Sequence, residues 1–178
     1  MFDSFKYKYG HAVLSNKKKK INRERGIFNF DTAKQCGIVF NATTQESYER
    51  AKSFIDFLIT KNIIVIAIGF VDSKEVQEFY RETIHFKYFS RKNINWYGKP
   101  RNTNVDEFIA NKFDILFDLS LSNDFPLEYI SALSLAKFKV GRYTSDNADY
   151  DLMIDISKNP KPDYLIEQIK NYISILNK

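Results

Sequence analysis

Short apolar runs alternate with amphipathic stretches along most of the chain, and this alternation limits the folds open to it. Residues 62–69 (NIIVIAIG) form a nearly continuous β-branched run, which is typical of a parallel strand covered on both faces. The runs 36–41 (CGIVFN) and 113–119 (FDILFDL) also indicate strands. Stretches with helical spacing separate these runs, and the connections are short. The pattern predicts an α/β protein, a single Rossmann-like three-layer domain with a mostly parallel sheet.

The expected helices begin at recognisable start signals. Residues 43–46 (TTQE) form a capping box that opens a helix through about residue 60. Proline favours the first turn of a helix, as at Pro126 and Pro162. The other expected elements are a short helix from residues 72–75 to about 80, a strand over 84–89 that alternates like a half-exposed one, a helix over 105–111 capped by Thr103 or Asn104, a helix from Pro126 to about 136, strands over 138–141 and 150–156, and a helix from Pro162.

The charged residues are distributed unevenly. Residues 1–26 hold eight Lys and Arg and two acidic residues, a net charge of +6, whereas the whole chain carries +5. We therefore expect a basic N-terminal arm (1–26) followed by a nearly neutral globular domain (27–178). The arm has few apolar residues and four consecutive lysines, so we expect it to be disordered or only partly helical. Clustered cations favour a polyanionic partner, because binding releases counterions.

The loop over residues 90–101 (SRKNINWYGKPR) combines aromatic and basic residues. Such clusters stack on unpaired bases while their cations contact phosphates. A loop tryptophan can equally pack as a lid on the hydrophobic core, and the residues leave both interpretations open. The candidate RNA-binding residues of the arm and the loop are Lys6, Lys8, Lys17, Lys18, Lys19, Lys20, Arg23, Arg25, Arg91, Lys92, Trp96, Tyr97, Lys99 and Arg101.

The leading functional hypothesis is a non-catalytic RNA-associated protein whose partner is RNA or a ribonucleoprotein such as the ribosome. A cytoplasmic location is expected, because no signal peptide is evident and the single cysteine, Cys36, suits a reducing compartment. The longest apolar run is shorter than the ~20 residues that a membrane span needs. Residues 2–9 resemble a short basic membrane anchor, but they are too short and too weakly apolar to hold a membrane alone.

The alternative hypothesis is a small-molecule (nucleotide or sugar) binding domain or enzyme. In a sheet of order 3-2-1-4-5-6, ligands bind beyond the carboxyl ends of the strands, at the switch point where the order reverses. The polar residues expected there also act as helix caps and turn formers, so a purely local role stays open. These residues are Asn41, Thr43, Thr44, Asp72, Ser73, Asp118, Ser120, Ser122 and Asn123, with Asp124 beside them.

No catalytic residue, cofactor or metal ligand is predicted. The six glycines form neither G-x-G-x-x-G nor a P-loop, so the known backbone cradles for phosphate are missing. His11 and His85 are the two histidines, and no Cys-x-x-Cys occurs. We expect His85 to be structural and Cys36 to be buried. Asp118 is the acid nearest to the expected ligand end.

The chain contains six distinctive segments: 30–43 (FDTAKQCGIVFNAT), 69–75 (GFVDSKE), 95–100 (NWYGKP), 113–121 (FDILFDLSL), 125–143 (FPLEYISALSLAKFKVGRY) and 150–156 (YDLMIDI). Together these segments resemble an uncharacterised family of small α/β proteins from Bacteroidota. The resemblance implies the α/β fold and a cytoplasmic setting, and it supplies no activity. Residues 113–143 are also similar, more weakly, to the acceptor-side half of heptosyltransferase-like glycosyltransferases, which need a second, nucleotide-sugar domain.

Overall fold

The structure is a computed structural model of the 178-residue chain, and it describes residues 2–74, 80–145 and 149–176. Within these residues, six strands form one parallel sheet in the order β3-β2-β1-β4-β5-β6. The parallel pairing and this order confirm the Rossmann-like α/β fold. The strands are β1 (Gln35–Asn41), β2 (Ile64–Val71), β3 (Phe86–Ser90), β4 (Ile115–Asp118), β5 (Phe138–Arg142) and β6 (Leu152–Ile154).

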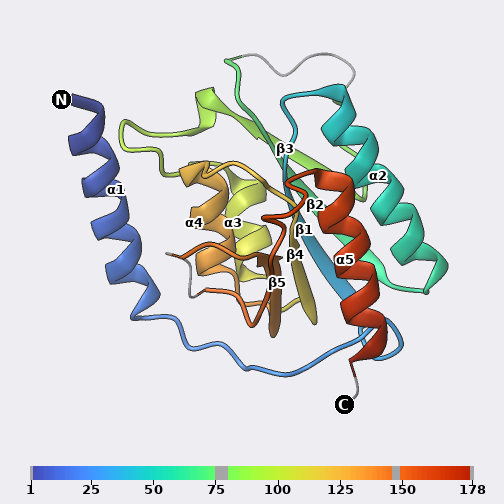
Figure 1. Ribbon diagram of the computed structural model, residues 1–178. Helices are drawn as coiled ribbons and strands as arrows, with labels where there is room; N and C mark the ends of the chain where they lie inside the picture. Colours follow the sequence, from blue (N-terminus) through green and yellow to red (C-terminus); the bar gives the residue numbers. More distant parts are fainter. Residues whose placement is uncertain (1, 75–79, 146–148, 177–178) are drawn as a thin grey trace.

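Helices cover both faces of the sheet (Figure 1). α2 and α5 pack on one face, and α3 and α4 pack on the other. Side chains alternate along β1, so that Ile38 and Phe40 belong to the core under α2 and α5, whereas Val39 belongs to the core under α3 and α4. The helices are α1 (Phe2–Lys18), α2 (Gln45–Thr60), α3 (Thr103–Ala110), α4 (Phe125–Leu133) and α5 (Pro162–Ile175), with a short 3-10 turn, η1 (Arg91–Asn93).

Some expected elements differ from the structure or lie outside it, and the strand expected over residues 150–156 forms over only Leu152–Ile154. Helix α3 starts before residue 105 because its N-cap is Asn102, whose side chain accepts a hydrogen bond from the backbone N–H of Asn104 at 2.8 Å. Strand β3 is buried rather than half-exposed, because α3 packs against it. The helix expected between residues 72–75 and 80 falls mainly on residues 75–79, which are outside the described part of the chain.

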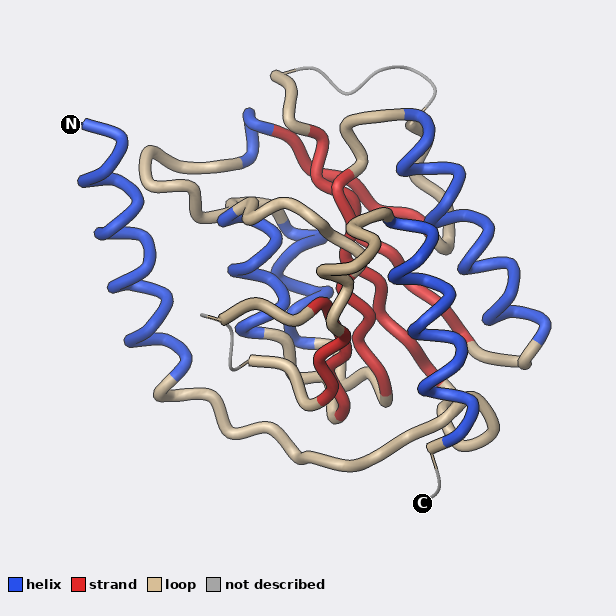
Figure 2. Tube along the Cα trace, viewed as in Figure 1, coloured by secondary structure: helices blue, strands red, loops and turns tan. Residues whose placement is uncertain are grey.

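The N-terminal arm forms a helix that packs on the domain. α1 lies outside α4 as an additional layer on that side of the sheet (Figures 1 and 2). Leu14 is 2% exposed and shares a buried cluster with Tyr129 and Leu133 of α4. The expectation of a disordered or only partly helical arm is therefore wrong for residues 2–18. The domain boundary after residue 26 stays a prediction.

The segment that links α1 to β1 passes the amino-terminal ends of the strands, as Figure 2 shows. Arg23 fastens this segment to the domain. Its guanidinium donates hydrogen bonds to the carbonyl oxygens of Ala136 and Lys137 at 3.2 and 2.9 Å, and to Asp151 at 2.7 Å. The backbone N–H of Gly26 also donates to Lys137. The arm is thus tied to the domain at both its helix and its connecting segment.

Candidate functional site

The carboxyl ends of β1 and β4 are neighbours at the point where the strand order reverses. Asn41 ends β1, and residues 119–124 connect β4 to α4. The Asn41 amide donates to Asp124 Oδ2 at 2.8 Å, and the Ser122 hydroxyl donates to the same oxygen at 2.5 Å. Polar side chains from both strand ends therefore meet at the switch point, and a cavity lies on each side of the β4–α4 connection.

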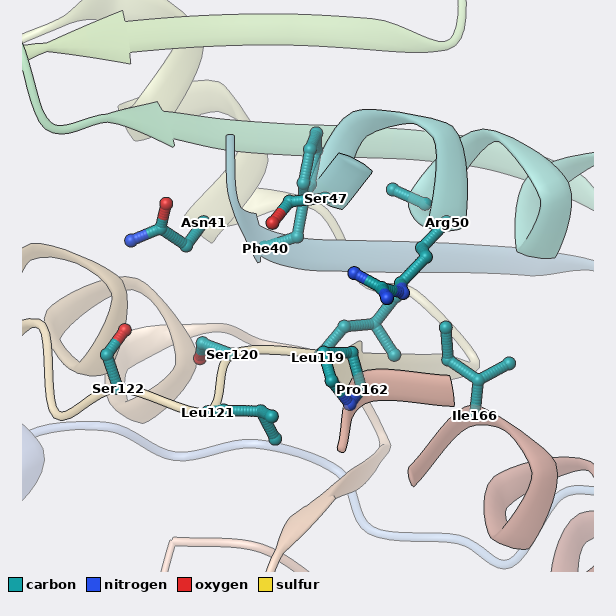
Figure 3. Close-up of a pocket in the computed structure, with 11 residues that line it drawn as sticks. Phe40, Asn41, Ser47, Arg50, Leu119, Ser120, Leu121, Ser122, Pro162 and Ile166 are labelled. Carbon is teal, nitrogen blue, oxygen red and sulfur yellow. The ribbon is translucent and has the colours of Figure 1, made fainter. Parts of the chain in front are cut away.

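The first cavity, between α2 and α5, has a volume of about 210 Å³ and is drawn in Figure 3. Phe40, Leu119 and Ile166 supply apolar walls, and Arg50 reaches into it from α2. The Arg50 guanidinium donates to Asp163 Oδ1 at 2.8 Å and to Glu46 at 2.5 Å, and these bonds raise its pKa. Because two carboxylates already neutralise Arg50, this cavity offers a mostly apolar space rather than a charged one.

The second cavity, here called the α1 cavity, has a volume of about 270 Å³. It lies between α1, the start of α4 and the carboxyl ends of β4 and β5, and its lining is strongly polar. Five of the predicted switch-point residues contribute to the two cavities, four of them here. The residues that line the α1 cavity are Tyr7, His11, Asp118, Ser120, Ser122, Asn123, Asp124, Glu128, Arg142, Thr144 and Tyr150.

Asp118 is the centre of a buried hydrogen-bond network in the floor of the α1 cavity. Its side chain is on the α4 face of the sheet, and the residue is 3% exposed. One carboxylate oxygen accepts from the backbone N–H and the hydroxyl of Ser120. The other oxygen accepts from Ser131 Oγ and from Tyr150 Oη, each at 2.6 Å. Four donors therefore hold this carboxylate, so it orders the floor rather than offering a free acceptor.

Lys139 extends the same network toward the end of α4. The residue is 2% exposed, and its ammonium donates to the carbonyl oxygens of Ser131 and Ala132 at 2.8 and 2.9 Å. Burial and the nearby Arg23 lower the pKa of Lys139 to about 7. Ser131 thus joins two buried charged residues, through its hydroxyl to Asp118 and through its carbonyl to Lys139.

His11 and Glu128 face each other across the contact between α1 and α4. His11 Nδ1 lies 3.4 Å from Glu128 Oε1, and the ring of His11 packs edge-on against Phe125. Burial raises the pKa of Glu128, although the nearby His11 opposes that shift. His11 Nε2 is buried and has no hydrogen-bond partner among the described residues. A buried imidazole nitrogen without a partner among the described residues thus lies at the contact between these two helices.

The remaining predicted switch-point residues serve local structure. Thr43 Oγ1 accepts a hydrogen bond from the backbone N–H of Asp72, and Asp72 forms an ion pair with Arg91. Thr44 caps α2 through a bond from the N–H of Ser47. Ser73 accepts a backbone bond from Arg91. Thr43, Thr44, Asp72 and Ser73 therefore line neither cavity.

The aromatic loop and the arm, separate in sequence, meet in space. The Tyr9 ring lies 5.0 Å from the ring of Trp96 and 5.2 Å from that of Tyr97, measured between centroids. Phe5 stacks beside Tyr9 at 6.4 Å. We call these four residues the aromatic strip. Phe5 is 62% exposed, Trp96 54% and Tyr9 43%, so the strip is a surface feature and Trp96 is not a lid on the core.

The close contact between α1 and this loop depends on Gly10. A Cβ at this position would lie 2.8 Å from the backbone oxygen of Tyr97 and 3.0 Å from the ring of Phe125. The loop itself turns through Gly98, which has a φ of 91°. A glycine on each side therefore allows the helix and the loop to approach.

Gly10→Ala is expected to weaken the docking of α1 by about 1–3 kcal/mol, because the added methyl meets backbone that cannot move aside. Intrinsic helix propensity alone would favour Ala by about 1 kcal/mol. A destabilising effect of Gly10→Ala would therefore report the close packing and not helix propensity. Limited trypsin digestion should cut faster at residues 17–20. Ala12→Gly, at an exposed position of the same helix, is the control that weakens the helix without touching the contact. Slower cleavage of Gly10→Ala than of the natural chain would contradict the close packing.

About half of the basic residues of the arm have partners within the protein. Lys17 donates to the Tyr129 hydroxyl at 2.8 Å. Lys18 pairs with Asp149, and Arg23 and Arg25 pair with Asp151. The exposed cations without an ion pair to a described residue include Lys8, Lys19, Lys20 and Arg101.

Several site residues were missed by reasoning from the sequence. Glu128 lies on α4, Arg142 ends β5 and Tyr150 lies in the connection before β6, yet their side chains gave no motif. A signal was present at Lys139, because a charged residue inside a short apolar strand is rarely buried without a partner. His11 was considered only as a metal ligand, since its contact with α4 depends on the docking of the arm. The described residues contain no group of three or more His, Cys, Asp or Glu arranged to hold a metal ion.

One protein-family model, described as a family of unknown function (DUF6913), matches residues 5–176. The match therefore spans α1 as well as the domain. No curated protein and no solved structure matches the chain. In the described part of the chain, no helix combines the length and the apolar character needed to cross a bilayer.

Proposed function

We propose that this chain, which belongs to the family of unknown function DUF6913, is a non-catalytic protein that binds single-stranded RNA in the cytoplasm. The observation that carries the proposal is the contact between Tyr9 of the arm and Trp96 of the loop, with both rings exposed. The two segments chosen from sequence as RNA-binding candidates thereby form one surface. RNA within a ribonucleoprotein particle such as the ribosome is the expected natural partner.

Exposed rings favour an unpaired strand over a duplex. Bases in a duplex are stacked on one another, whereas unpaired bases can stack on protein rings. Phe5, Tyr9 and Trp96 lie one beside the next, and each is at least 43% exposed. Lys8 adjoins Tyr9 in the helix, and Lys99 and Arg101 follow Trp96 in the loop. Rings for bases with cations beside them for phosphates are the usual parts of a single-strand binding surface.

We expect the affinity for RNA to depend less on salt concentration than it would if all eight basic residues of the arm were free to contact phosphates. Four arm residues, Lys17, Lys18, Arg23 and Arg25, have partners within the protein. If about four phosphates are neutralised, the affinity for a single strand should fall roughly fiftyfold between 50 and 200 mM salt. Affinity that is constant over this range would remove the electrostatic part of the proposal.

Trp96→Ala is expected to weaken binding of a labelled oligouridylate roughly 5-fold to 150-fold, because one base–aromatic stack is worth about 1–3 kcal/mol. The melting temperature should stay nearly unchanged, since Trp96 is more than half exposed. Trp96 is the single tryptophan of the chain, so stacking in the natural protein should also quench its fluorescence.

The matched control is Tyr172→Ala, which removes a comparably exposed ring from α5, on the other face of the sheet. It should bind oligouridylate like the natural protein. A duplex of the same length should bind more weakly than the single strand. Equal affinities of the Trp96→Ala and Tyr172→Ala variants, or oligouridylate binding without quenching, would contradict the proposed surface.

A further inference from the structure

The α1 cavity contains opposite charges that do not pair with each other. Glu128 enters its lining from the first turn of α4, and Arg142 enters from the end of β5. Among the described residues, no ion pair joins these two side chains. Arg142 donates one bond through Nη2 to Asn123 Oδ1, and Glu128 contacts His11 through one oxygen. Both charged side chains therefore line the same cavity without pairing with each other.

The two other carboxylates of the lining are already bonded within the protein. Both oxygens of Asp118 accept two hydrogen bonds each. Asp124 Oδ2 accepts from Asn41 and from Ser122. The charged groups left to recognise a ligand are therefore the Arg142 guanidinium as a donor and the Glu128 carboxylate as an acceptor.

This arrangement selects against ligands that carry one sign of charge. A purely anionic ligand would approach three carboxylates in the lining, those of Asp118, Asp124 and Glu128. A purely cationic ligand would approach Arg142 and would leave its guanidinium without an anionic partner. A neutral polyol can form hydrogen bonds with both groups, but it supplies an opposite charge to neither, and charge-assisted bonds between opposite charges are the stronger ones.

We propose that the α1 cavity binds a free α-amino acid. Its carboxylate accepts hydrogen bonds from the Arg142 guanidinium, whose planar N–H groups match the two oxygens of a carboxylate. Its ammonium group donates to Glu128. A volume of about 270 Å³ holds one such molecule, and Tyr7 and His11 of α1 cover it from the arm side. The site is separate from the aromatic strip and does not depend on RNA binding.

The ligand class is tested on the natural protein, first by adding each of the twenty common L-amino acids and measuring the melting temperature. At least one should raise it in a concentration-dependent way, as a ligand that binds only the folded state must. The best amino acid is then compared with its decarboxylated amine and with its deaminated acid by calorimetric titration. Each analogue should bind roughly tenfold to a hundredfold more weakly, because each lacks one charge-assisted contact.

Two variants connect binding to the named side chains. Arg142→Gln and Glu128→Gln should each weaken binding of the best amino acid by a similar tenfold to hundredfold factor. Arg81→Gln, which removes an exposed cation outside the cavity, should bind it like the natural protein. The melting temperatures of the Arg142→Gln and Glu128→Gln variants without added ligand report whether they are folded. Their oligouridylate binding should equal that of the natural protein, which separates this proposal from the RNA proposal.

Three results would overturn the assignment. The first is the absence of any shift of the melting temperature with all twenty amino acids. The second is equal affinity for the amino acid and for one of its two analogues. The third is unchanged amino-acid affinity in both Arg142→Gln and Glu128→Gln. If a neutral sugar or a nucleotide raised the melting temperature in their place, the cavity would hold a different class of ligand.

Discussion

Asp118→Ala is expected to destabilise the protein by about 3–5 kcal/mol, one of the largest effects that a single polar substitution should have in this chain. The substitution removes the common acceptor of Ser120, Ser131 and Tyr150, all at or near the protein interior. Each buried hydroxyl left without a partner costs about 1–3 kcal/mol, less where water reaches it. Chemical denaturation at neutral pH measures the loss.

Two further variants make this result specific. Asp118→Asn keeps a carbonyl acceptor of nearly the same shape, so its cost should lie between those of the natural residue and alanine. Asp56→Ala changes an exposed aspartate on α2 and should stay within about 0.5 kcal/mol of the natural protein. A loss of less than about 1 kcal/mol for Asp118→Ala would show that the three hydroxyls find other partners.

The second large effect is the pH dependence that Lys139 contributes. The pKa of its buried ammonium is lowered to about 7, whereas a lysine in the unfolded chain keeps a value near 10.5. Between these two values the unfolded chain binds a proton that the folded chain does not bind. Raising the pH therefore favours the folded state across this interval, and below about pH 7 the favourable contribution is absent.

From pH 7 to pH 9 this single group should add about 2–3 kcal/mol to the free energy of unfolding. Lys139→Met should remove that part of the rise, so that its stability curve is flatter over the same interval. Lys112→Met, at an exposed lysine, should keep the slope of the natural protein. Denaturation at a series of pH values gives the slopes directly. Equal slopes for the natural protein and Lys139→Met would mean that the buried ammonium titrates normally.

The sheet could be predicted from the sequence because its central strands are nearly continuous runs of apolar residues. The β-branched run that became β2 (Ile64–Val71) is buried on both faces over most of its length, as such runs are in parallel sheets. Right-handed crossovers then leave few possible orders of the strands, and the Rossmann order is among them. The switch point followed from that order, which is why Asn41 and Ser122 were expected to be near each other.

The arm could not be predicted in the same way, because its local pattern and its tertiary contacts disagree. Four consecutive lysines and few apolar residues favour disorder when residues 1–26 are read alone. Its docking depends on Leu14, on a close approach at Gly10, and on bonds to α4 and to Asp149 and Asp151. The bonding partners in α4 and before β6 lie more than 100 residues away in the sequence. Helix propensity depends on neighbouring residues, so it carries no information about such distant contacts. The α1 cavity was missed for the same reason, since α1 forms one of its walls.

The docking of α1 also sets an order of events during synthesis. α1 is near the start of the chain, yet Lys17 meets Tyr129 across 112 residues and Arg23 meets Asp151 across 128. A chain that emerges from the ribosome N-terminus first must expose the arm while nearly all of the sheet is still to be made. Closing a loop of this length costs entropy that only the finished α4 and the segment before β6 can offset. A helix that is made before the sheet is therefore expected to reach its final position after the sheet has formed.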